Sequence, residues 1–361
     1  MSAVAPLSEQ PATAFPAPSK TTAPAPAEWR GYARDEVRLL VGRPGALSHI
    51  RFRDLPDHLD RGDLLVVNDS ATEARQLDAR LVGRGPVVLH LAQRLRDGDW
   101  AVELRTPPDA ARPILDAVEG DVVLVARSGL RLSLTAAYPR RRSSPTGRGN
   151  RLWRARVTGD VEHALVTEAR PIAYGYLDQR YPLEAYQTVF GHRPGSAEMP
   201  SAARPFTPEL VTRLVARGVQ IAPITLHTGV SSQEAGEAPP PEWFEVTAAT
   251  ARIVRDTKLA GGRVVAVGTT ATRALESAVT RRGRRGYTVR AARGWSDRVV
   301  TPEHPPYVVD GLITGWHDPH ASHLLLVEAV AGRDLTQQAY DAAVAAGYLW
   351  HEFGDAALFL P

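Results

Sequence analysis

The sequence predicts an α/β catalytic domain, with a mostly parallel sheet and flanking helices, interrupted by an all-β barrel-like domain. From residue 160 onward, apolar strand-like runs alternate with amphipathic helical segments, which is typical of a parallel sheet flanked by helices. Between residues 78 and 158, Gly, Asp and Pro separate short β-rich runs, as in a barrel or sandwich. We therefore expect the α/β domain to comprise residues 28–77 and 159–361, and the inserted domain to comprise residues 78–158.

The segment before the first domain has the composition of a disordered tail. Residues 1–27 are rich in Ala, Pro, Ser and Thr, and they lack the basic and apolar regions of a signal peptide. No later segment approaches the roughly 18 consecutive apolar residues that a membrane span requires. The chain has no cysteine, which excludes disulfides, thiolate metal sites and cysteine nucleophiles. We expect a cytoplasmic protein without a membrane partner, and the sequence leaves its oligomeric state open.

The first element of the α/β domain is a buried strand in "GDLLVVND" (62–69), a short apolar run that ends at an Asn-Asp turn. The inserted domain follows with its own β-rich runs, which are "PVVLHLAQRL", "DWAVELR", "DVVLVAR", "LRLSLTAAY" and "LWRARVTG". Because these runs are short and evenly spaced, they predict the strands of one barrel.

The remaining elements alternate between helix and strand. "TPELVTRLVARG" predicts an amphipathic helix that ends at Gly218, and "VQIAPITLH" predicts a strand. "EVTAATARIVRDTKLAGG" predicts a second helix, and "RVVAVG" predicts a buried strand. Ligands of such folds bind outside the carboxyl ends of the strands. The residues that follow "ITLH" and "VVAVG" are therefore the first places to look for a site.

Both of these strand ends carry residues suited to chemistry. In "GGRVVAVGTTATRALESA" (261–278), Thr269 or Thr270 can cap a helix whose free N–H groups favour a carboxylate or phosphate. An ordinary strand-to-helix turn explains the same pattern, because the glycine spacing is not that of a dinucleotide site or a P-loop. His227 ends the other strand, where an imidazole can accept or donate a proton near neutral pH.

Three histidines, His317, His320 and His323, lie close together in "TGWHDPHASH" and raise the question of a metal site. On one helix their side chains would point in different directions, since neighbouring positions are about 100° apart. Pro319 argues against a helix here, so the stretch is a loop. No carboxylate pattern nearby matches a known metal motif. The residues alone therefore leave a zinc or iron site open without supporting it.

Two clusters of arginine suggest contact with nucleic acid. The first comprises Arg140, Arg141 and Arg142, and the second comprises Arg281, Arg282, Arg284 and Arg285. Such clusters can neutralise phosphates. A solvated loop explains each of them equally well, because the net charge of the chain is only +3.

Eight segments, taken in order, resemble the S-adenosylmethionine:tRNA ribosyltransferase-isomerases of queuosine biosynthesis. They are "RDLPDHLDRGDLLVVNDS", "YQTVFGHRPGS", "TLHTG", "EWFEV", "GGRVVAVGTTATRALES", "TGWHDPHAS", "AYDAAVAAGY" and "FGDAALFL". The resemblance extends from about Arg34 to the C-terminus. It implies an α/β domain interrupted by a β-barrel, which agrees with the change of pattern described above.

The resemblance also implies a reaction. The ribosyl part of S-adenosylmethionine, the donor substrate, moves to the aminomethyl group of a 7-deazaguanine base in tRNA and is rearranged to an epoxycyclopentane, while adenine and methionine leave. This chemistry needs a base near the 5′ carbon, an acid or strong donor for adenine and a group that neutralises the methionine carboxylate. It needs no metal.

On this basis we assign candidate roles within the matching segments. The candidate catalytic residues are His227 as the base or proton shuttle, His317 and Asp69. Thr269, Thr270 and the N-terminus of their helix would hold an anionic group, and Arg273 would pair with a carboxylate or phosphate. The full set of candidate substrate-binding residues is Asn68, Ser196, Thr225, Gly229, Gly268, Thr269, Thr270, Arg273, Ser322 and Asp355. In the histidine-rich loop His317 carries the resemblance, and His320 and His323 are expected to be bystanders.

The chain departs from the family pattern at polar loop positions. Ala71 stands where the family has Arg, Pro205 replaces a His, and the loop before Glu242 is short and lacks further His residues. These departures keep three alternatives open. A diverged enzyme could use S-adenosylmethionine with another, small-molecule acceptor, or the chain could be a non-catalytic RNA-binding relative. A metal-dependent hydrolase is a more remote alternative.

Overall fold

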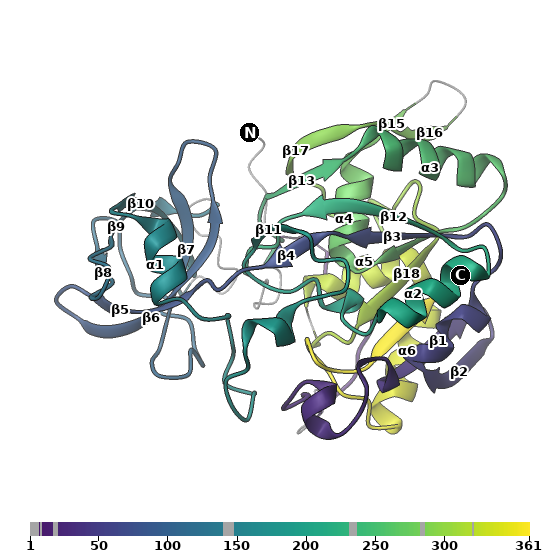
Figure 1. Cartoon of the computed structure of the whole chain (residues 1–361), viewed down its shortest axis with the longest axis horizontal. Helices are drawn as coiled ribbons and strands as arrows, with labels where there is room; N and C mark the ends of the chain where they lie inside the picture. The colour runs from purple at the N-terminus through teal and green to yellow at the C-terminus, as the bar shows by residue number, and fades with distance from the viewer. Residues whose placement is uncertain are drawn as a thin grey trace.

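The computed structural model describes residues 7, 9–16, 21–139, 148–230, 237–281, 286–319 and 321–361. Within these residues nine strands form one sheet in the order β17-β13-β12-β3-β14-β18-β19-β1-β2 (Figure 1). The strands are β1 (Arg38–Arg43), β2 (Ala46–Arg51), β3 (Leu64–Asn68), β12 (Gln220–Leu226), β13 (Glu242–Val246), β14 (Val264–Val267), β17 (Ala292–Ser296), β18 (Gly311–Gly315) and β19 (Ala356–Phe359).

The centre of this sheet is parallel and its flanks are mixed. Strands β12, β3, β14 and β18 run in one direction. Strands β3 and β14 are buried along their whole length, as expected where helices cover both faces. On one flank β13 and β17 are antiparallel to their neighbours, and on the other β19 is antiparallel to β18. The predicted fold class is confirmed, and the antiparallel flanks are an addition that the sequence pattern did not indicate.

Helices pack on both faces of the sheet. Alternate residues of β3 point to opposite faces, so Leu64 and Val66 join one hydrophobic cluster and Leu65 and Val67 join another. Helices α3 to α6 contribute to the first cluster, and α2 contributes to the second. The helices are α1 (Val161–Thr167), α2 (Pro208–Ala216), α3 (Ala248–Leu259), α4 (Thr269–Ser277), α5 (Ser322–Ala331) and α6 (Arg333–Ala345). In the described part of the chain, none of these helices is long and apolar enough to cross a membrane.

A closed barrel lies beside the sheet, on the left in Figure 1. Its strands are β5 (Gln76–Leu81), β6 (Gly85–Arg94), β7 (Trp100–Arg105), β8 (Val122–Leu124), β9 (Arg131–Ala137) and β10 (Leu152–Thr158). Leu89, Val102, Leu104 and Leu132 are among the side chains that fill its interior, and Ala164 of α1 packs against the same cluster. The barrel-like domain predicted from the short β-rich runs is therefore present.

Short elements connect these two bodies. Strand β4 (Ser70–Thr72) follows β3 directly and pairs in parallel with β11 (Arg193–Ser196), through which the chain returns from the barrel. Strands β15 (Val279–Arg281) and β16 (Tyr287–Val289) form a small antiparallel pair. The 3₁₀ helices are η1 (Ala27–Arg30), η2 (Arg34–Glu36), η3 (Phe52–His58), η4 (Leu183–Tyr186) and η5 (Ser201–Ala203).

The described part of the N-terminal segment is packed, so the expectation of a disordered tail is wrong for these residues. The Phe15 ring lies against the rings of Tyr340 and Trp350, with centroids 4.8 and 5.3 Å away. The backbone N–H and the hydroxyl of Thr13 both donate to Glu328 Oε1 at 2.7 Å. These long-range contacts supply the burial that the local composition does not reveal.

A buried ion cluster lies on the outer face of the barrel. Glu103 is fully buried, and its Oε1 accepts from Arg105 Nη1 at 2.7 Å and from Arg151 Nη1 at 2.9 Å. His90 Nδ1 lies 3.2 Å from Glu103 Oε2, and Arg151 Nη2 donates to Glu237 Oε1 at 2.8 Å. Burial alone would raise the pKa of Glu103, but Arg151, His90 and Arg105 together hold it well below its usual value.

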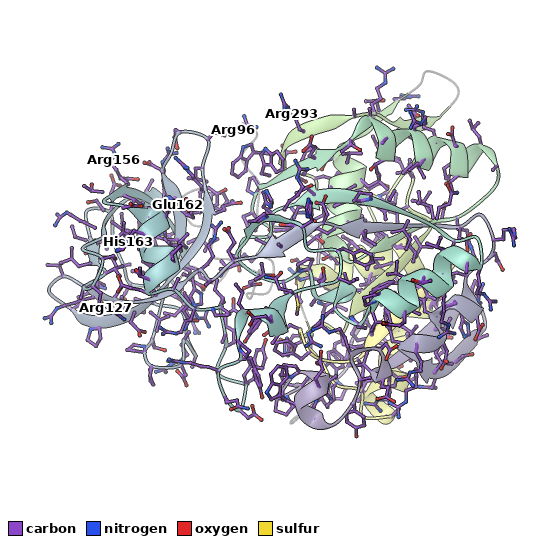
Figure 2. All side chains as sticks on the ribbon, viewed as in Figure 1. Arg96, Arg127, Arg156, Glu162, His163 and Arg293 are labelled. Atoms are coloured by element: carbon purple, nitrogen blue, oxygen red, sulfur yellow. The ribbon has the colours of Figure 1, made fainter. Side chains whose placement is uncertain are left out.

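Glu103→Gln is expected to lower the free energy of unfolding by about 3–5 kcal/mol, because it leaves buried guanidinium groups without their counter-charge. Since the folded-state pKa of Glu103 is depressed, its contribution is fully present above the unfolded-state value and is lost as the pH falls below it. Urea unfolding at pH 7 and at pH 4 should show a smaller pH dependence in the variant. Glu162→Gln, at an exposed position on helix α1 beside the barrel (Figure 2), should change neither the stability nor its pH dependence.

Candidate active site

A cavity of about 600 Å³ lies where the carboxyl ends of β14 and β18 meet the barrel. This volume is within the range of about 300–1,000 Å³ that is typical of small-molecule sites. The residues after β14 and β18 form one side of the cavity, and Arg105 of barrel strand β7 contributes to the opposite side. The site is therefore at the strand ends that the fold class indicated.

Helix α4 begins at this cavity without a side-chain cap. Its N-cap residue is Gly268, with φ +93°, a conformation that favours glycine. The expectation that Thr269 or Thr270 caps the helix is wrong, because no side chain accepts from its first turn. Asn68 Nδ2 lies 3.4 Å from Thr270 Oγ1 and links β3 to the helix. The first-turn N–H groups of α4 have no intrahelical acceptor and are available to an anion.

Helix α5 also begins at the cavity, and it brings two histidines together. Its N-cap residue Ala321 offers no side-chain cap, and Ser322 and His323 line the cavity. The rings of His317 and His323 stack with centroids 4.7 Å apart, and His317 Nε2 lies 3.1 Å from Thr314 Oγ1. The structure therefore places His323, which we expected to be a bystander, in the cavity wall beside His317.

These imidazoles are neutral at pH 7. Burial, together with the neighbouring His323, lowers the pKa of His317 well below its usual value. Burial, together with Arg273, lowers the pKa of His323 to about 4. The cavity can thus accept a cationic ligand without repulsion from imidazolium groups. In the described residues no cluster of three or more His, Cys, Asp or Glu side chains is suited to a metal ion.

A second part of the wall combines tyrosines with carboxyl groups. The hydroxyl of Tyr174 donates to Glu198 Oε1, and that of Tyr176 bonds to Glu352. The Tyr176 ring stacks on His351, whose backbone has φ 66°, a strained conformation for a residue other than glycine. Burial and the nearby Glu198 raise the pKa of Glu352 to about 8, so its carboxyl group is protonated at neutral pH.

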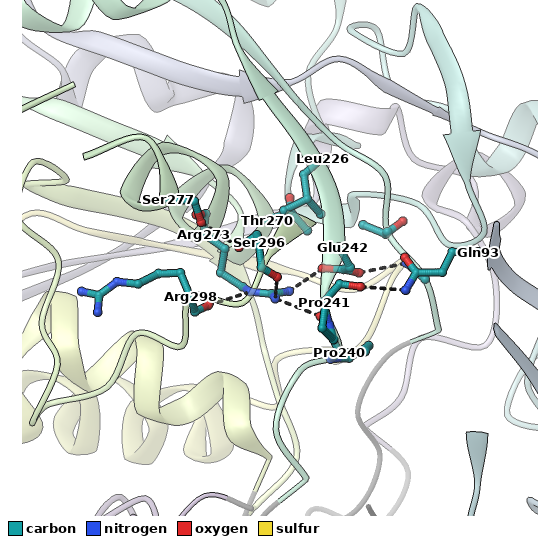
Figure 3. Close-up of polar contacts among 12 residues, drawn as sticks. Gln93, Leu226, Pro240, Pro241, Glu242, Thr270, Arg273, Ser277, Ser296 and Arg298 are labelled. Carbon is teal, nitrogen blue, oxygen red and sulfur yellow. Dashed lines mark hydrogen bonds and ion pairs between the residues drawn. The ribbon is translucent and has the colours of Figure 1, made fainter. Parts of the chain in front are cut away.

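A buried ion pair fixes the helix behind the cavity (Figure 3). Arg273 of α4 pairs through Nη1 with Glu242 Oε2, and Gly229 N donates to Glu242 Oε1 at 2.8 Å. Arg273 Nη2 and Nε also donate to the carbonyls of Pro240 and Arg298, at 3.0 and 3.2 Å. Since every nitrogen of this guanidinium already has an acceptor in the protein, Arg273 positions the site and does not extend a free charge into it.

His227 lies outside the cavity. Its Nδ1 is 2.8 Å from Ser70 Oγ, which is 2.6 Å from Ser196 Oγ, and Thr228 N donates to Ser196 Oγ at 3.0 Å. Gly195 permits this arrangement, because a Cβ there would lie 2.5 Å from the His227 ring. Burial, with Arg75 nearby, lowers the pKa of His227 to about 4. A chain of hydrogen bonds through Ser70, Ser196 and the backbone of Thr228 thus connects the His227 ring to the cavity wall.

Asp69 and Thr225 lie on the same side of the sheet as His227. Thr225 Oγ1 donates to Asp69 Oδ1 at 2.6 Å and accepts from Arg193 Nη1 at 2.8 Å. Burial raises the pKa of Asp69. Arg193 also pairs with Glu245 at 2.7 Å. These side chains form a polar cluster behind the cavity wall.

The predicted site residues therefore divide into two groups. Those that line the cavity are Gly229, Gly268, Thr269, Thr270, Arg273, His317 and Ser322. Those that do not line it are Asn68, Asp69, Ser196, Thr225, His227 and Asp355. Asp355 pairs with Arg38 at 2.7 Å and lies beside the neighbouring crevice.

Of the seven predicted RNA-binding arginines, one lies within the described residues. Arg281 is an exposed residue at the end of β15. Six others lie outside the described residues, namely Arg140, Arg141, Arg142, Arg282, Arg284 and Arg285. His320 of the histidine-rich loop also lies outside them.

Sequence reasoning missed several residues of the cavity wall. They are Tyr174, Tyr176, Glu198, His351 and Glu352. One signal was available for the last two, because "HE" interrupts the apolar segment "YLWHEFGDAALFL" near the C-terminus. Charged residues inside an apolar run are uncommon unless they have a partner or a role. The others had no sequence signal that we recognise.

Comparisons with known proteins agree on one family. The family model described as "Queuosine biosynthesis protein" matches residues 12–359. The S-adenosylmethionine:tRNA ribosyltransferase-isomerase of Symbiobacterium thermophilum is 36% identical over 342 residues, which cover 91% of this chain and 94% of that protein. The protein of the same name from Thermus thermophilus is 34% identical over 348 residues, covering 91% and 93%.

A solved structure shows the same fold. The crystal structure of the S-adenosylmethionine tRNA ribosyltransferase from Thermotoga maritima aligns with a TM-score of 0.51 and 28% identity. The alignment covers 96% of this chain and 99% of that one. The likeness therefore includes both the sheet and the barrel.

Arg273→Ala is expected to lower the free energy of unfolding by about 3–5 kcal/mol, because it leaves the buried carboxylate of Glu242 without its partner. Denaturant unfolding monitored by tryptophan fluorescence would measure this loss. Arg252→Ala, at an exposed position on helix α3, is the matched control and should change stability by less than about 0.5 kcal/mol. Equal stability of the two variants would contradict the structural role of Arg273.

Proposed function

Because the chain belongs to the family of queuosine biosynthesis proteins, we propose that it acts as an S-adenosylmethionine:tRNA ribosyltransferase-isomerase. It transfers the ribosyl part of S-adenosylmethionine to 7-aminomethyl-7-deazaguanine in tRNA, isomerises it and releases adenine and methionine. The family relationship does not favour a small-molecule acceptor or a non-catalytic role. A substrate of this kind also implies action in the cytoplasm, where tRNA is found.

The observation that carries the proposal is the polarity of the cavity. S-adenosylmethionine has a carboxylate at one end and a sulfonium and an amino group nearby. The uncapped N-termini of α4 and α5 offer N–H groups to the carboxylate. Glu198 lies in the same cavity and suits the cationic groups. A ligand with a carboxylate at one end and cationic groups nearby can thus bind the helix N-termini and the acidic part of the cavity at the same time.

We propose His317 as the base that removes the proton from the 5′ carbon. It lines the cavity, and its neutral imidazole can accept a proton. His323 stacks on it and fixes the plane of the ring. His227 then has a positioning role, since Ser70 and Ser196 lie between its ring and the cavity residue Thr228. Asp69, beside Thr225, belongs to the same supporting cluster.

We propose Glu352 as the acid that protonates the departing adenine. When the bond between the ribose 1′ carbon and the base breaks, its electron pair passes to adenine, and a ring nitrogen takes the carboxyl proton of Glu352. Glu352 lines the cavity, and its Oε1 is buried with no hydrogen-bond partner in the described chain. A buried polar atom in this position requires a partner, and a substrate nitrogen can supply one.

Both domains of the fold would contribute residues to the reaction. We propose residues 28–77 and 159–361 as the catalytic domain and residues 78–158 as the inserted domain. The inserted domain contributes Arg105 to the cavity, and Gln93 Nε2 donates to Pro241 O of the catalytic domain at 2.7 Å. The barrel therefore forms part of the reaction chamber.

Purified protein with S-adenosylmethionine and tRNA carrying 7-aminomethyl-7-deazaguanine is expected to release adenine and methionine in equal amounts, which chromatography would measure. The same tRNA with an unmodified guanine is the control and should support no release. Release without tRNA would point to a small-molecule acceptor. Binding of tRNA without release would point to a non-catalytic relative.

Glu352→Gln is expected to slow adenine release by about 10²–10⁴-fold, the usual contribution of a positioned general acid. The wild-type rate should fall as the pH rises through about 8, because Glu352 then loses its proton. This alkaline limb should disappear in the variant. Calorimetric binding of S-adenosylmethionine would separate a loss of chemistry from a loss of affinity.

Glu209→Gln, at an exposed position on α2, is the control for the charge change and should retain the wild-type rate and pH profile. A Glu352→Gln enzyme with both properties unchanged would remove Glu352 from the mechanism.

A further inference from the structure

A second hollow lies next to the cavity, on the outside of the molecule, at the junction of the barrel and the sheet. It has a volume of about 760 Å³, and Arg96, Arg293, Trp295, Arg298, Val299 and His304 are among its lining residues. Arg96 belongs to the hairpin between β6 and β7, and Arg293 and Trp295 belong to the edge strand β17. We call this hollow the Arg96–Trp295 groove.

The groove combines cationic and aromatic side chains. The Arg96 guanidinium lies 5.9 Å from the centre of the Trp295 ring, across the junction of the two bodies. Trp295 is paired with Trp243 on the neighbouring strand, and Trp243 stacks on His227 with ring centroids 5.1 Å apart. Arg96 and Arg293 are both exposed, and Figure 2 shows them on the same side of the molecule. Arginine with an aromatic platform is the combination that binds single-stranded nucleic acid.

The acidic residues of the groove do not cancel this charge. Glu276 accepts hydrogen bonds from the backbone N–H groups of residues 307–309, at 2.9 to 3.1 Å, and burial raises its pKa. Asp297 is an acidic neighbour on the same lining. Arg96, Arg293 and Arg298 outnumber these two carboxylates. The groove therefore favours a polyanion.

The groove adjoins the catalytic cavity. Val299 lines both of them, and the carbonyl of Arg298 accepts from Arg273 Nε in the cavity wall at 3.2 Å. Beyond the groove, the exposed rings of Tyr287 and Tyr307 stack 3.9 Å apart, and Arg298 lies over Tyr307. A strand that follows the groove can thus bring one base to the cavity while its neighbours meet aromatic rings.

We propose that the Arg96–Trp295 groove is the docking surface for the tRNA substrate, with Arg96 and Arg293 on phosphates and Trp295 stacked against an unpaired base. The proposal rests on the proposed function and specifies where its larger substrate binds. It differs from the sequence-based expectation, which assigned RNA contact to Arg140–Arg142 and to the cluster that begins at Arg281. In this arrangement the barrel and the edge strand hold the tRNA together.

The test is the salt dependence of tRNA binding, measured by filter binding with the full chain and unfractionated tRNA. The double variant Arg96→Ala/Arg293→Ala should weaken binding by at least tenfold at low salt. The slope of log K against log salt should become shallower by about 2, because two phosphate contacts are lost. Both side chains are exposed, so the variant should fold normally, which its melting temperature would verify.

The matched control is Arg127→Ala/Arg156→Ala, which removes the same charge from exposed positions on the far side of the barrel (Figure 2). This control should keep the wild-type affinity and slope. If the two double variants bind tRNA equally, net charge and not the groove governs binding, and the proposal is wrong.

Trp295→Leu tests the stacking contact separately. It should weaken tRNA binding by about tenfold without changing the salt slope, because stacking involves no counterion release. Unchanged affinity would remove Trp295 from the docking surface. Failure of the proposed reaction would look different. The wild-type protein would then bind tRNA but release no adenine, and the groove variants would still lose tRNA binding. A wild-type protein that binds no tRNA would overturn the groove proposal itself.

Discussion

The buried pair of Glu242 and Arg273 connects the elements that surround the cavity. A carboxylate or a guanidinium removed from water alone is strongly destabilised, so each of these groups requires the other. Glu242 is in strand β13 and also accepts from the N–H of Gly229, while Arg273 is in helix α4 and also donates to the carbonyls of Pro240 and Arg298. The strand, the helix and three loop segments are thereby held in one arrangement. The position of the α4 N-terminus, which faces the cavity, follows from it.

The electrostatics of the cavity follow from its burial. Burial disfavours the charged form of any titratable group, so it lowers the pKa of a histidine and raises that of a glutamate. His317 and His323 are therefore neutral at pH 7, and Glu352 is protonated. A cationic donor then meets imidazole and carboxyl groups that carry no repelling charge. The same protonated carboxyl group can give its proton to a leaving base, which an ionised glutamate could not do.

The sequence was sufficient for the architecture because periodicity and spacing report directly on strands, helices and the change from one domain to the next. It was less informative on side-chain direction. His227 directly follows the last residue of β12 at the ligand-binding edge, so the strand ends one residue before the predicted position, but residues alternate between faces along this strand. Thr225 and His227 consequently share one face of the sheet, and Leu226 points to the opposite face, where it packs with α4 in the first hydrophobic cluster. Phe15 packs against Tyr340 and Trp350, which are more than three hundred residues away in the chain, so no local pattern could reveal this contact.

The place of the insertion explains why the barrel takes part in the site. Strand β3 ends at Asn68, and the chain continues through β4 into the barrel and returns through β11, which pairs with β4. An insertion that leaves the sheet at the carboxyl end of a central parallel strand must lie beside the edge where such folds bind ligands. The barrel consequently contributes Arg105 to the cavity and Arg96 to the adjoining groove. A small donor and a large acceptor can thus meet at one junction, because the same insertion forms a wall for each of them.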